Sequence, residues 1–194
     1  MNDNSFSCLV ILAGGQSRRM GRDKATLQFD GQRLIDRAIA RYQSSVDRIF
    51  LSATHDFDTG LDYIPDDPDM PDGPVGAIFT IAAQLRSLCS EATSFTTIPV
   101  DAPFAPDDIV SRLHAVSGCS VAKTDQRLHP VFGHWQSDIV NGVRESQGAN
   151  KQSLSLQWLA QQCNAIAFDW PDEAAFININ TPEDLAIAKR NDYS

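Results

Sequence analysis

Short apolar runs alternate with amphipathic segments along most of the 194-residue chain. Continuous apolar runs are typical of buried strands, and an apolar position every three or four residues is typical of a helix. We expect strands at or near residues 8–12, 48–53, 63, 93–100, 119–122, 130–135, 165–168 and 176–179. We expect helices over residues 32–43, 75–88, 106–116, 138–145 and 153–162, and a last helix opening at residues 181–184. This alternation predicts an α/β fold with a mostly parallel central sheet and helices on both faces.

The length, composition and charge narrow the class of protein. With 194 residues and 42% hydrophobic content, one domain over residues 1–194 is expected. The net charge of -9 argues against a nucleic-acid partner. No stretch is long enough for a membrane span, and the first residues lack the basic start of a secretory signal. We therefore expect a cytoplasmic protein with reduced, mostly buried cysteines, at Cys8, Cys89, Cys119 and Cys163.

The most distinctive stretch is a glycine-rich, basic loop over residues 12–24, directly after the first apolar run. Adjacent glycines allow a sharp turn and let a ligand approach the backbone amides. Four cations follow within seven residues, at Arg18, Arg19, Arg22 and Lys24. The loop lacks the Lys-Ser/Thr of a P-loop and the Gly-x-Gly-x-x-Gly of a dinucleotide site. It predicts a different polyphosphate cradle, and the alternative is a glycine turn followed by solvated charges.

A carboxylate is expected to face this loop. Asp101 directly follows the apolar run 93–100, and the carboxyl ends of parallel strands meet at one edge of a sheet. Mg²⁺ needs only one or two protein carboxylates when phosphates and water complete its shell. The pairing predicts Mg²⁺-assisted transfer at phosphorus, with Asp101 as the metal ligand.

Two histidines, His129 and His134, lie close together but match no metal motif. On a strand, an offset of five residues directs two side chains to opposite faces. We therefore interpret neither as a metal ligand, although His129 could line a substrate cleft or have a structural role.

Three separated motifs resemble one known family. They are Leu-Ala-Gly-Gly-x-Ser-x-Arg-Met-Gly with Lys24, Val-Asp-Ala-Pro-Phe at 100–104, and Asn-Ile-Asn-Thr-Pro-Glu-Asp-Leu at 178–185. Together they are similar to the signature of nucleotidyltransferases with a Rossmann-like GT-A fold, and most similar to the molybdenum cofactor guanylyltransferases. This resemblance implies a single nucleotidyltransferase domain. Residues 1–104 would form its nucleotide- and Mg²⁺-binding half, and residues 105–194 its acceptor-side half.

The resemblance also implies roles for individual residues. Nucleotide contacts are expected at Leu12, Ala13, Gly14, Gly15, Arg19, Lys24, Ser52, Asp66 and Asp101. Lys24 and Arg19 would hold the phosphates, Asp101 would bind Mg²⁺ and substrate, and Asp66 could accept hydrogen bonds from a guanine edge. Ser52 departs from the asparagine associated with its position.

On the acceptor side, the implied contacts are His129, in a His-Pro pair with Pro130, and Asn178 and Asn180. Two departures affect local contacts. Residues 73–77 read Gly-Pro-Val-Gly-Ala where family members read Gly-Pro-Leu-Ala-Gly, and Ala102 replaces a common threonine.

The expected reaction is transfer of GMP from GTP to the terminal phosphate of molybdenum-molybdopterin cofactor, giving the guanine dinucleotide cofactor and pyrophosphate. Molybdoenzymes or their chaperones are candidate partners. The nearest alternatives are a molybdenum cofactor cytidylyltransferase and a sugar-1-phosphate nucleotidyltransferase; cytidylyl relatives read Leu-Ala-Ala-Gly where this chain has Gly14. An alternative of another class is a non-catalytic module that binds nucleotide or cofactor and delivers it.

Overall fold

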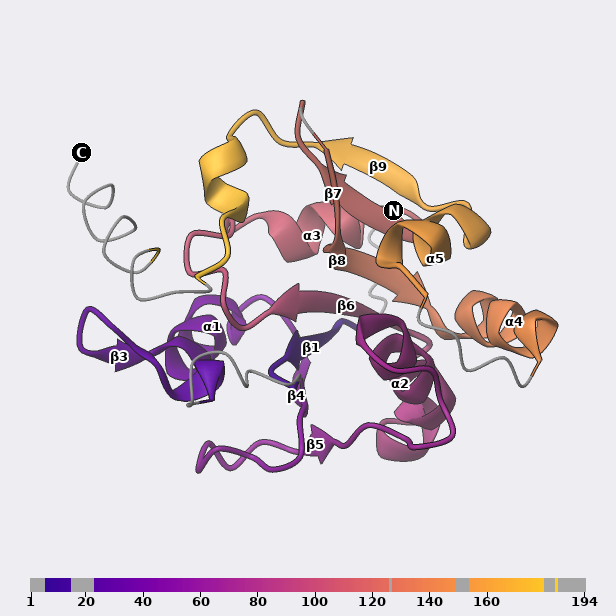
Figure 1. Cartoon of the computed structure of the whole chain (residues 1–194), viewed down its shortest axis with the longest axis horizontal. Helices are drawn as coiled ribbons and strands as arrows, with labels where there is room; N and C mark the ends of the chain where they lie inside the picture. Colours follow the sequence, from indigo (N-terminus) through magenta and orange to yellow (C-terminus); the bar gives the residue numbers. More distant parts are fainter. Residues whose placement is uncertain (1–5, 15–22, 126, 149–153, 180–183, 185–194) are drawn as a thin grey trace.

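A seven-stranded sheet forms the centre of the molecule in a computed structural model, which describes residues 6–14, 23–125, 127–148, 154–179 and 184 (Figure 1). The strand order is β5-β4-β1-β6-β8-β7-β9. The strands are β1 (Cys8–Leu12), β4 (Arg48–Ser52), β5 (Tyr63–Ile64), β6 (Ser94–Pro99), β7 (Ser120–Lys123), β8 (Leu128–Gln136) and β9 (Ile166–Asp169). A separate hairpin joins β2 (Gln28–Phe29) to β3 (Gln32–Arg33).

The sheet is mostly parallel, as predicted. β1 pairs in parallel with β4 and β6, β4 with β5, and β7 with β9. β8 runs antiparallel to both β6 and β7. Because β6 and β8 are paired, strands from residues 1–104 and 105–194 belong to one sheet.

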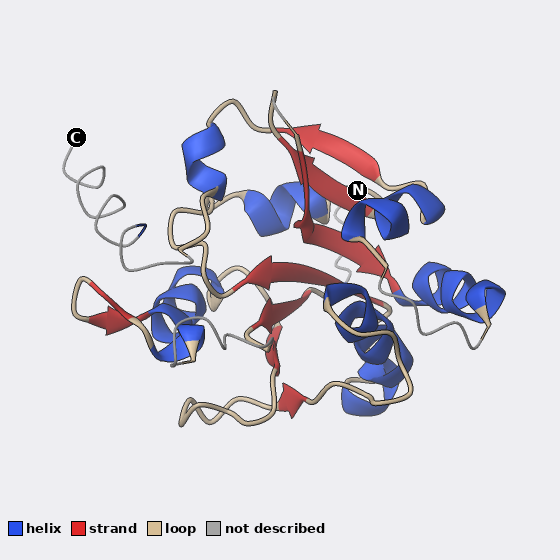
Figure 2. Cartoon of the chain, viewed as in Figure 1, coloured by secondary structure: helices blue, strands red, loops and turns tan. Residues whose placement is uncertain are grey.

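Helices cover both faces of the sheet (Figure 2). They are α1 (Leu34–Tyr42), α2 (Pro74–Leu88), α3 (Ile109–Leu113), α4 (Ser137–Gln147) and α5 (Leu156–Gln162), with short 3-10 turns η1 (Lys24–Thr26) and η2 (Glu173–Phe176). One apolar cluster packs α1, α3 and η2 on one face of the sheet. The other packs α2, α4 and α5 on the opposite face. Alternate residues of β1, such as Leu9 and Val10, belong to opposite clusters because successive strand side chains point to opposite faces.

The segment that precedes α1 differs from the prediction. Residues 32–33 form a hairpin strand, and the helix begins at Leu34. Asp30 and Gly31 have positive φ angles of 50° and 79°, as a tight two-residue hairpin turn requires. An Asp-Gly pair is a strong hairpin signal, so this hairpin could have been predicted from the sequence.

The predicted helix from Pro106 to Val116 is wrong at both ends, because α3 covers only Ile109–Leu113. The Pro106 carbonyl accepts the Ile109 amide in an i→i+3 turn, and side chains of α1 contact the carbonyls that precede α3. The Tyr42 hydroxyl lies 3.2 Å from the Pro106 carbonyl oxygen, and the Arg41 guanidinium donates to the Ala105 carbonyl.

The predicted strand at 176–179 is also wrong. Phe176 ends the 3-10 turn η2, and residues 177–179 have no strand pairing. The aromatic ring of Phe176 packs against Phe132, His129 and Trp170. Its burial therefore comes from these rings and not from a sheet.

Other predictions have mixed outcomes. Cys8, Cys119 and Cys163 are free and buried, and Cys89 is half-buried. Of the helix start predicted at residues 181–184, only Asp184 lies within the described residues. Within the described ranges, none of the helices has the length and apolar character needed to cross a bilayer.

Candidate active site

Three parallel strands end together at one edge of the sheet. Leu12 at the end of β1 is in register with Ser52 of β4 and Pro99 of β6. The Ser52 carbonyl oxygen accepts hydrogen bonds from the amides of Ala13 at 3.0 Å and Gly14 at 2.7 Å. These two amides are therefore already hydrogen-bonded inside the protein.

The same contact explains a glycine at position 14. A Cβ atom there would lie 3.2 Å from the Ser52 carbonyl oxygen, which is tighter than usual van der Waals contact. Ser52 itself is only 3% exposed. The predicted nucleotide contacts of Leu12, Ala13, Gly14 and Ser52 remain predictions. Gly15, Arg18, Arg19 and Arg22 lie outside the described residues.

Lys24 and Asp101, predicted to act together, are in direct contact. Lys24 Nζ lies 2.8 Å from Asp101 Oδ2, and their side chains are 24% and 11% exposed. Lys24 begins the turn η1, which is capped by the Asp23 side chain bonding to the Ala25 amide. The sequence therefore folds so that the last cation of the basic loop reaches the carboxylate at the end of β6.

Backbone hydrogen bonds hold Asp101 from both sides. The Val100 amide bonds to the Leu12 carbonyl at 3.1 Å, which extends the β1–β6 pairing. The Asp101 carbonyl accepts a hydrogen bond from the Ile179 amide at 2.8 Å. The backbone that carries the carboxylate is thus bonded to the glycine-loop strand and to the segment that contains Asn178.

Asp101 is the residue at this edge that would hold a Mg²⁺ ion, beside its ion pair with Lys24. Asp101 supplies one carboxylate, which suffices when substrate phosphates and water provide the other ligands. Among the described residues, no group of three or more His, Cys, Asp or Glu side chains could hold a metal by itself. Any ion at Asp101 would therefore depend on the substrate's phosphates for its remaining shell.

Asp66 lies two residues beyond β5, at the same edge of the parallel sheet. Its side chain is exposed, and partial desolvation raises the pKa of its carboxyl. Its position is compatible with a ligand that extends across β1 and β4 toward β5. A contact with guanine remains a prediction.

His129 and Asn178, predicted on the acceptor side, line one cavity of about 410 Å³. Apolar walls come from β8, α5 and η2, and Pro74 at the start of α2 contributes to the rim. The residues lining it are Pro74, Arg127, Leu128, His129, Pro130, Val131, Phe132, Ser155, Leu156, Gln157, Phe176 and Asn178. Because Ile179 bonds to Asp101, this cavity and the carboxylate share one segment of chain. Asn180 lies outside the described residues.

Sequence reasoning missed the polar residues that surround His129. Thr124 Oγ1 lies 2.9 Å from His129 Nε2 and donates a hydrogen bond to Glu173. Arg127 forms an ion pair with Glu173, with Nε 3.2 Å from Oε1. The four side chains come from the β7–β8 turn, β8 and η2, so only the tertiary fold brings them together.

The expectation that His129 and His134 face opposite sides of the sheet is wrong. Opposite β8, the β7 register passes from Val121↔Gly133 directly to Ala122↔His129. This irregularity places extra residues in β8 and cancels the simple alternation. His129 stacks on Phe176 and His134 packs on His114, both on the face that carries α3 and η2.

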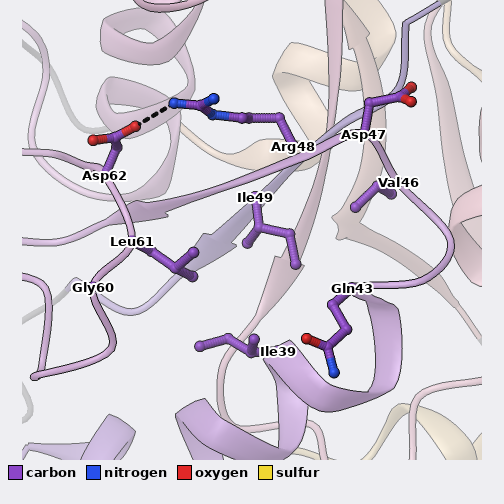
Figure 3. A pocket seen from close by; sticks show the side chains of 9 residues that line it. All are labelled: Ile39, Gln43, Val46, Asp47, Arg48, Ile49, Gly60, Leu61 and Asp62. Atoms are coloured by element: carbon purple, nitrogen blue, oxygen red, sulfur yellow. Dashed lines mark hydrogen bonds and ion pairs between the residues drawn. The ribbon is translucent and has the colours of Figure 1, made fainter.

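A second cavity, of about 320 Å³, lies at the opposite edge of the sheet, near the amino end of β4 (Figure 3). Its apolar floor includes Ile39, Ile49 and Leu61. At its mouth Arg48 pairs with Asp62, with Nη2 2.7 Å from Oδ2. These two side chains are 52% and 59% exposed, so solvent screens this pair more strongly than the Lys24–Asp101 pair.

Comparisons with known proteins agree with this geometry. Residues 9–165 match the MobA-like NTP transferase domain. A molybdenum cofactor guanylyltransferase of Cereibacter sphaeroides is 33% identical over 187 residues, covering 93% of this chain and 94% of that protein. One from Rhizobium johnstonii is 32% identical over 204 residues, covering 97% and 94%.

Solved structures share the fold at lower identity. Molybdopterin-guanine dinucleotide biosynthesis protein A from Archaeoglobus fulgidus superposes with a TM-score of 0.73 at 17% identity, over 96% of this chain and 98% of that one. A 4-diphosphocytidyl-2C-methyl-D-erythritol synthase from Anaerococcus prevotii also reaches 0.73, at 14% identity, over 99% and 98%. From its motifs, its sheet and its match over residues 9–165, the chain belongs to the MobA-like NTP transferase family and is a nucleotidyltransferase.

Proposed function

We propose that this enzyme transfers GMP from GTP to the terminal phosphate of molybdenum-molybdopterin cofactor. The observation that carries the proposal is the Lys24–Asp101 pair at the end of β6, 2.8 Å apart and linked through Ile179 to the cavity that contains His129. The names of the relatives from Cereibacter sphaeroides and Rhizobium johnstonii support the acceptor and the nucleotide.

The chain's own residues bind and orient the reacting phosphates. An anionic oxygen of the acceptor phosphate attacks the α-phosphorus of GTP, the new P–O bond forms, and the bond to the β-phosphate oxygen breaks to release pyrophosphate. The attacking oxygen carries no proton, so no general base is required. Lys24, together with Arg19, neutralises charge on the leaving pyrophosphate. Asp101 would hold Mg²⁺, which supplies charge neutralisation and alignment at the α-phosphate.

Guanine selectivity is assigned to Asp66. Ionised carboxylate oxygens only accept hydrogen bonds, and the guanine edge presents N–H donors. The residue's place beyond β5, on the edge where Lys24 and Asp101 lie, supports this assignment.

The direct test incubates the purified protein with Mg²⁺, molybdopterin cofactor and GTP, CTP, ATP or UTP in turn. Pyrophosphate release and the mass of the dinucleotide product are measured. GTP should give product at the highest rate. Product only with CTP would establish the cytidylyl alternative, and turnover only when a sugar 1-phosphate replaces the cofactor would establish a sugar-phosphate transferase.

A matched pair of variants tests the site itself. Asp101→Asn should abolish pyrophosphate release while GTP binding is partly retained. Asp62→Asn removes a carboxylate that is also ion-paired but lies at the opposite edge of the sheet, and turnover should stay at the wild-type rate. Unchanged turnover in Asp101→Asn would show that the metal site is misplaced.

A binding module that only delivers cofactor is the alternative from another class. The retention of both Lys24 and Asp101, in contact, argues for the enzyme, since delivery needs neither. Stoichiometric binding of GTP and cofactor without pyrophosphate release would support delivery.

We place the reaction in the cytoplasm, because free buried thiols such as Cys8 and Cys119 persist in a reducing compartment. Molybdoenzymes or their chaperones would receive the product.

A further inference from the structure

A hydrogen-bonded chain runs from the surface to the ring of His129. It begins at Arg127, whose guanidinium pairs with Glu173. Glu173 accepts the hydroxyl of Thr124, and Thr124 contacts His129 Nε2 at 2.9 Å. Thr124 and His129 are 1% and 6% exposed, so the inner part of the chain is shielded from water.

The direction of each bond follows from counting protons. A threonine hydroxyl has one proton to donate, and a carboxylate paired with a guanidinium acts only as an acceptor. The Arg127 carbonyl oxygen, 3.4 Å from the hydroxyl, is likewise only an acceptor, so the Thr124 proton goes to Glu173 or to this more distant carbonyl and not to the histidine. The hydroxyl oxygen must then accept at His129, which requires a proton on Nε2.

The ring is held in one orientation and is neutral. It stacks on Phe176 with centroids 4.6 Å apart and planes inclined by 22°. Burial first, and then nearby Arg127, lower the pKa of His129, while Glu173 raises it. With Nε2 protonated in a neutral ring, Nδ1 carries a lone pair and can only accept. Within the described part of the chain, the structure gives Nδ1 no hydrogen-bond partner, and the ring lines the cavity.

We propose that Thr124 and Glu173 are positioning residues that fix His129 as the Nε2–H tautomer, so that Nδ1 accepts a hydrogen bond from an N–H or O–H group of the acceptor substrate. This inference rests on the proposed function for the identity of that substrate. The cavity suits a planar heterocycle with N–H donors, because its walls include Phe132, Leu156 and Phe176 and its polar groups include Gln157 and Asn178.

The tautomer can be measured without any ligand. Long-range ¹H–¹⁵N correlation of protein with ¹⁵N-labelled histidine, at pH 7.5, distinguishes protonated from bare ring nitrogens. The chain has four histidines, so the His129 signals are those lost in His129→Gln. We expect a single Nε2–H tautomer in the wild type. An Nδ1–H form in the wild type would overturn the proposal.

Variants distinguish positioning from simple packing. Thr124→Val removes the acceptor for Nε2–H. Glu173→Gln replaces an acceptor-only carboxylate by an amide that can also donate to the hydroxyl, so the hydroxyl is free to donate to the ring; each variant should give a mixture of tautomers. Thr124→Ser keeps the hydroxyl and should restore the wild-type spectrum. Thr59→Val makes the same chemical change outside the cavity and should leave His129 unaltered. Because Glu173 is 40% exposed, Glu173→Gln serves as the test if Thr124→Val does not fold. Wild-type His129 signals in both variants would refute the inference.

Kinetics then test the ligand contact. Thr124→Val should raise KM for molybdopterin cofactor about tenfold and leave KM for GTP unchanged, with recovery in Thr124→Ser. An equal rise in both KM values would indicate a merely structural role. If the wild type forms no product with any nucleotide, the proposed function fails, and the NMR measurement still decides the tautomer.

Discussion

The Lys24–Asp101 pair allows stability and catalysis to be separated in one double-mutant cycle. Each single change, Lys24→Met or Asp101→Asn, leaves one charged or polar partner behind at a site where the side chains are 24% and 11% exposed. A charge-assisted hydrogen bond contributes about 1.5–3 kcal/mol. Because the Lys24 side chain is 24% exposed and solvent screens the pair, we expect a loss of unfolding free energy at the lower end of this range, about 1.5 kcal/mol for each single variant.

The double variant should recover most of that stability. It replaces the ion pair by two neutral groups of similar volume, so that no unpaired charge remains. For a chain of this size, about 1.5 kcal/mol corresponds to a fall in Tm of about 3–6 °C in each single variant. Calorimetry and urea denaturation would measure both quantities. Stability losses that simply add in the double variant would show that the two side chains do not interact in solution.

Catalytic activity, unlike stability, should not recover in the double variant. Lys24→Met removes a cation from the leaving pyrophosphate and should lower kcat/KM about 100- to 1,000-fold. The double variant should remain as inactive as the worse single variant, although its stability has recovered. Wild-type kcat/KM in Lys24→Met would refute the role of this lysine in catalysis.

Three further predictions concern a helix start, a buried ring and base selectivity. Gly76→Ala should destabilise the protein by about 2–4 kcal/mol, since its Cβ would lie 1.8 Å from the Pro71 carbonyl oxygen. The control Gly142→Ala, in open space on α4, should be neutral or stabilise by up to about 1 kcal/mol. Thermal unfolding measures both effects, and equal effects would contradict the packing argument. Burial holds the pKa of His134 at about 3, so below about pH 6.5 only the unfolded chain takes up this proton and stability falls as the pH drops, by up to about 1.4 kcal/mol per unit. His134→Gln should flatten that fall in urea denaturation between pH 7.5 and 5, and an unchanged slope would contradict this assignment. Asp66→Asn should reduce the preference for GTP over CTP in kcat/KM about 10- to 100-fold, and an unaltered ratio would remove Asp66 from the base site.

The sequence predicted the elements whose pattern is set locally. Apolar runs identified β1, β4 and β6, and the position of Asp101 after such a run predicted that it faces the loop that carries Lys24. A parallel sheet places strand ends at one edge, so this placement required only the fold class, whereas the direct ion pair is seen only in the structure.

The features that escaped prediction depend on tertiary contacts. The turn before α3 is contacted by Tyr42 and Arg41 from another helix, and Phe176 is buried by rings rather than by strand pairing. The face of His129 depends on an irregularity in β8, which changes the alternation of side chains. The hairpin at Asp30 and Gly31 is different, because its turn signal was present in the sequence.

The bond from the Ile179 amide to the Asp101 carbonyl has a consequence for synthesis of the chain. Lys24 precedes Asp101 by 77 residues, and Ile179 follows it by a similar separation. During translation, the glycine loop and its lysine leave the ribosome long before the segment that attaches Asp101 to the acceptor cavity. A nascent chain can therefore form the strands β1, β4 and β6 early, but the complete arrangement of carboxylate and cavity forms only when the last part of the protein has been made.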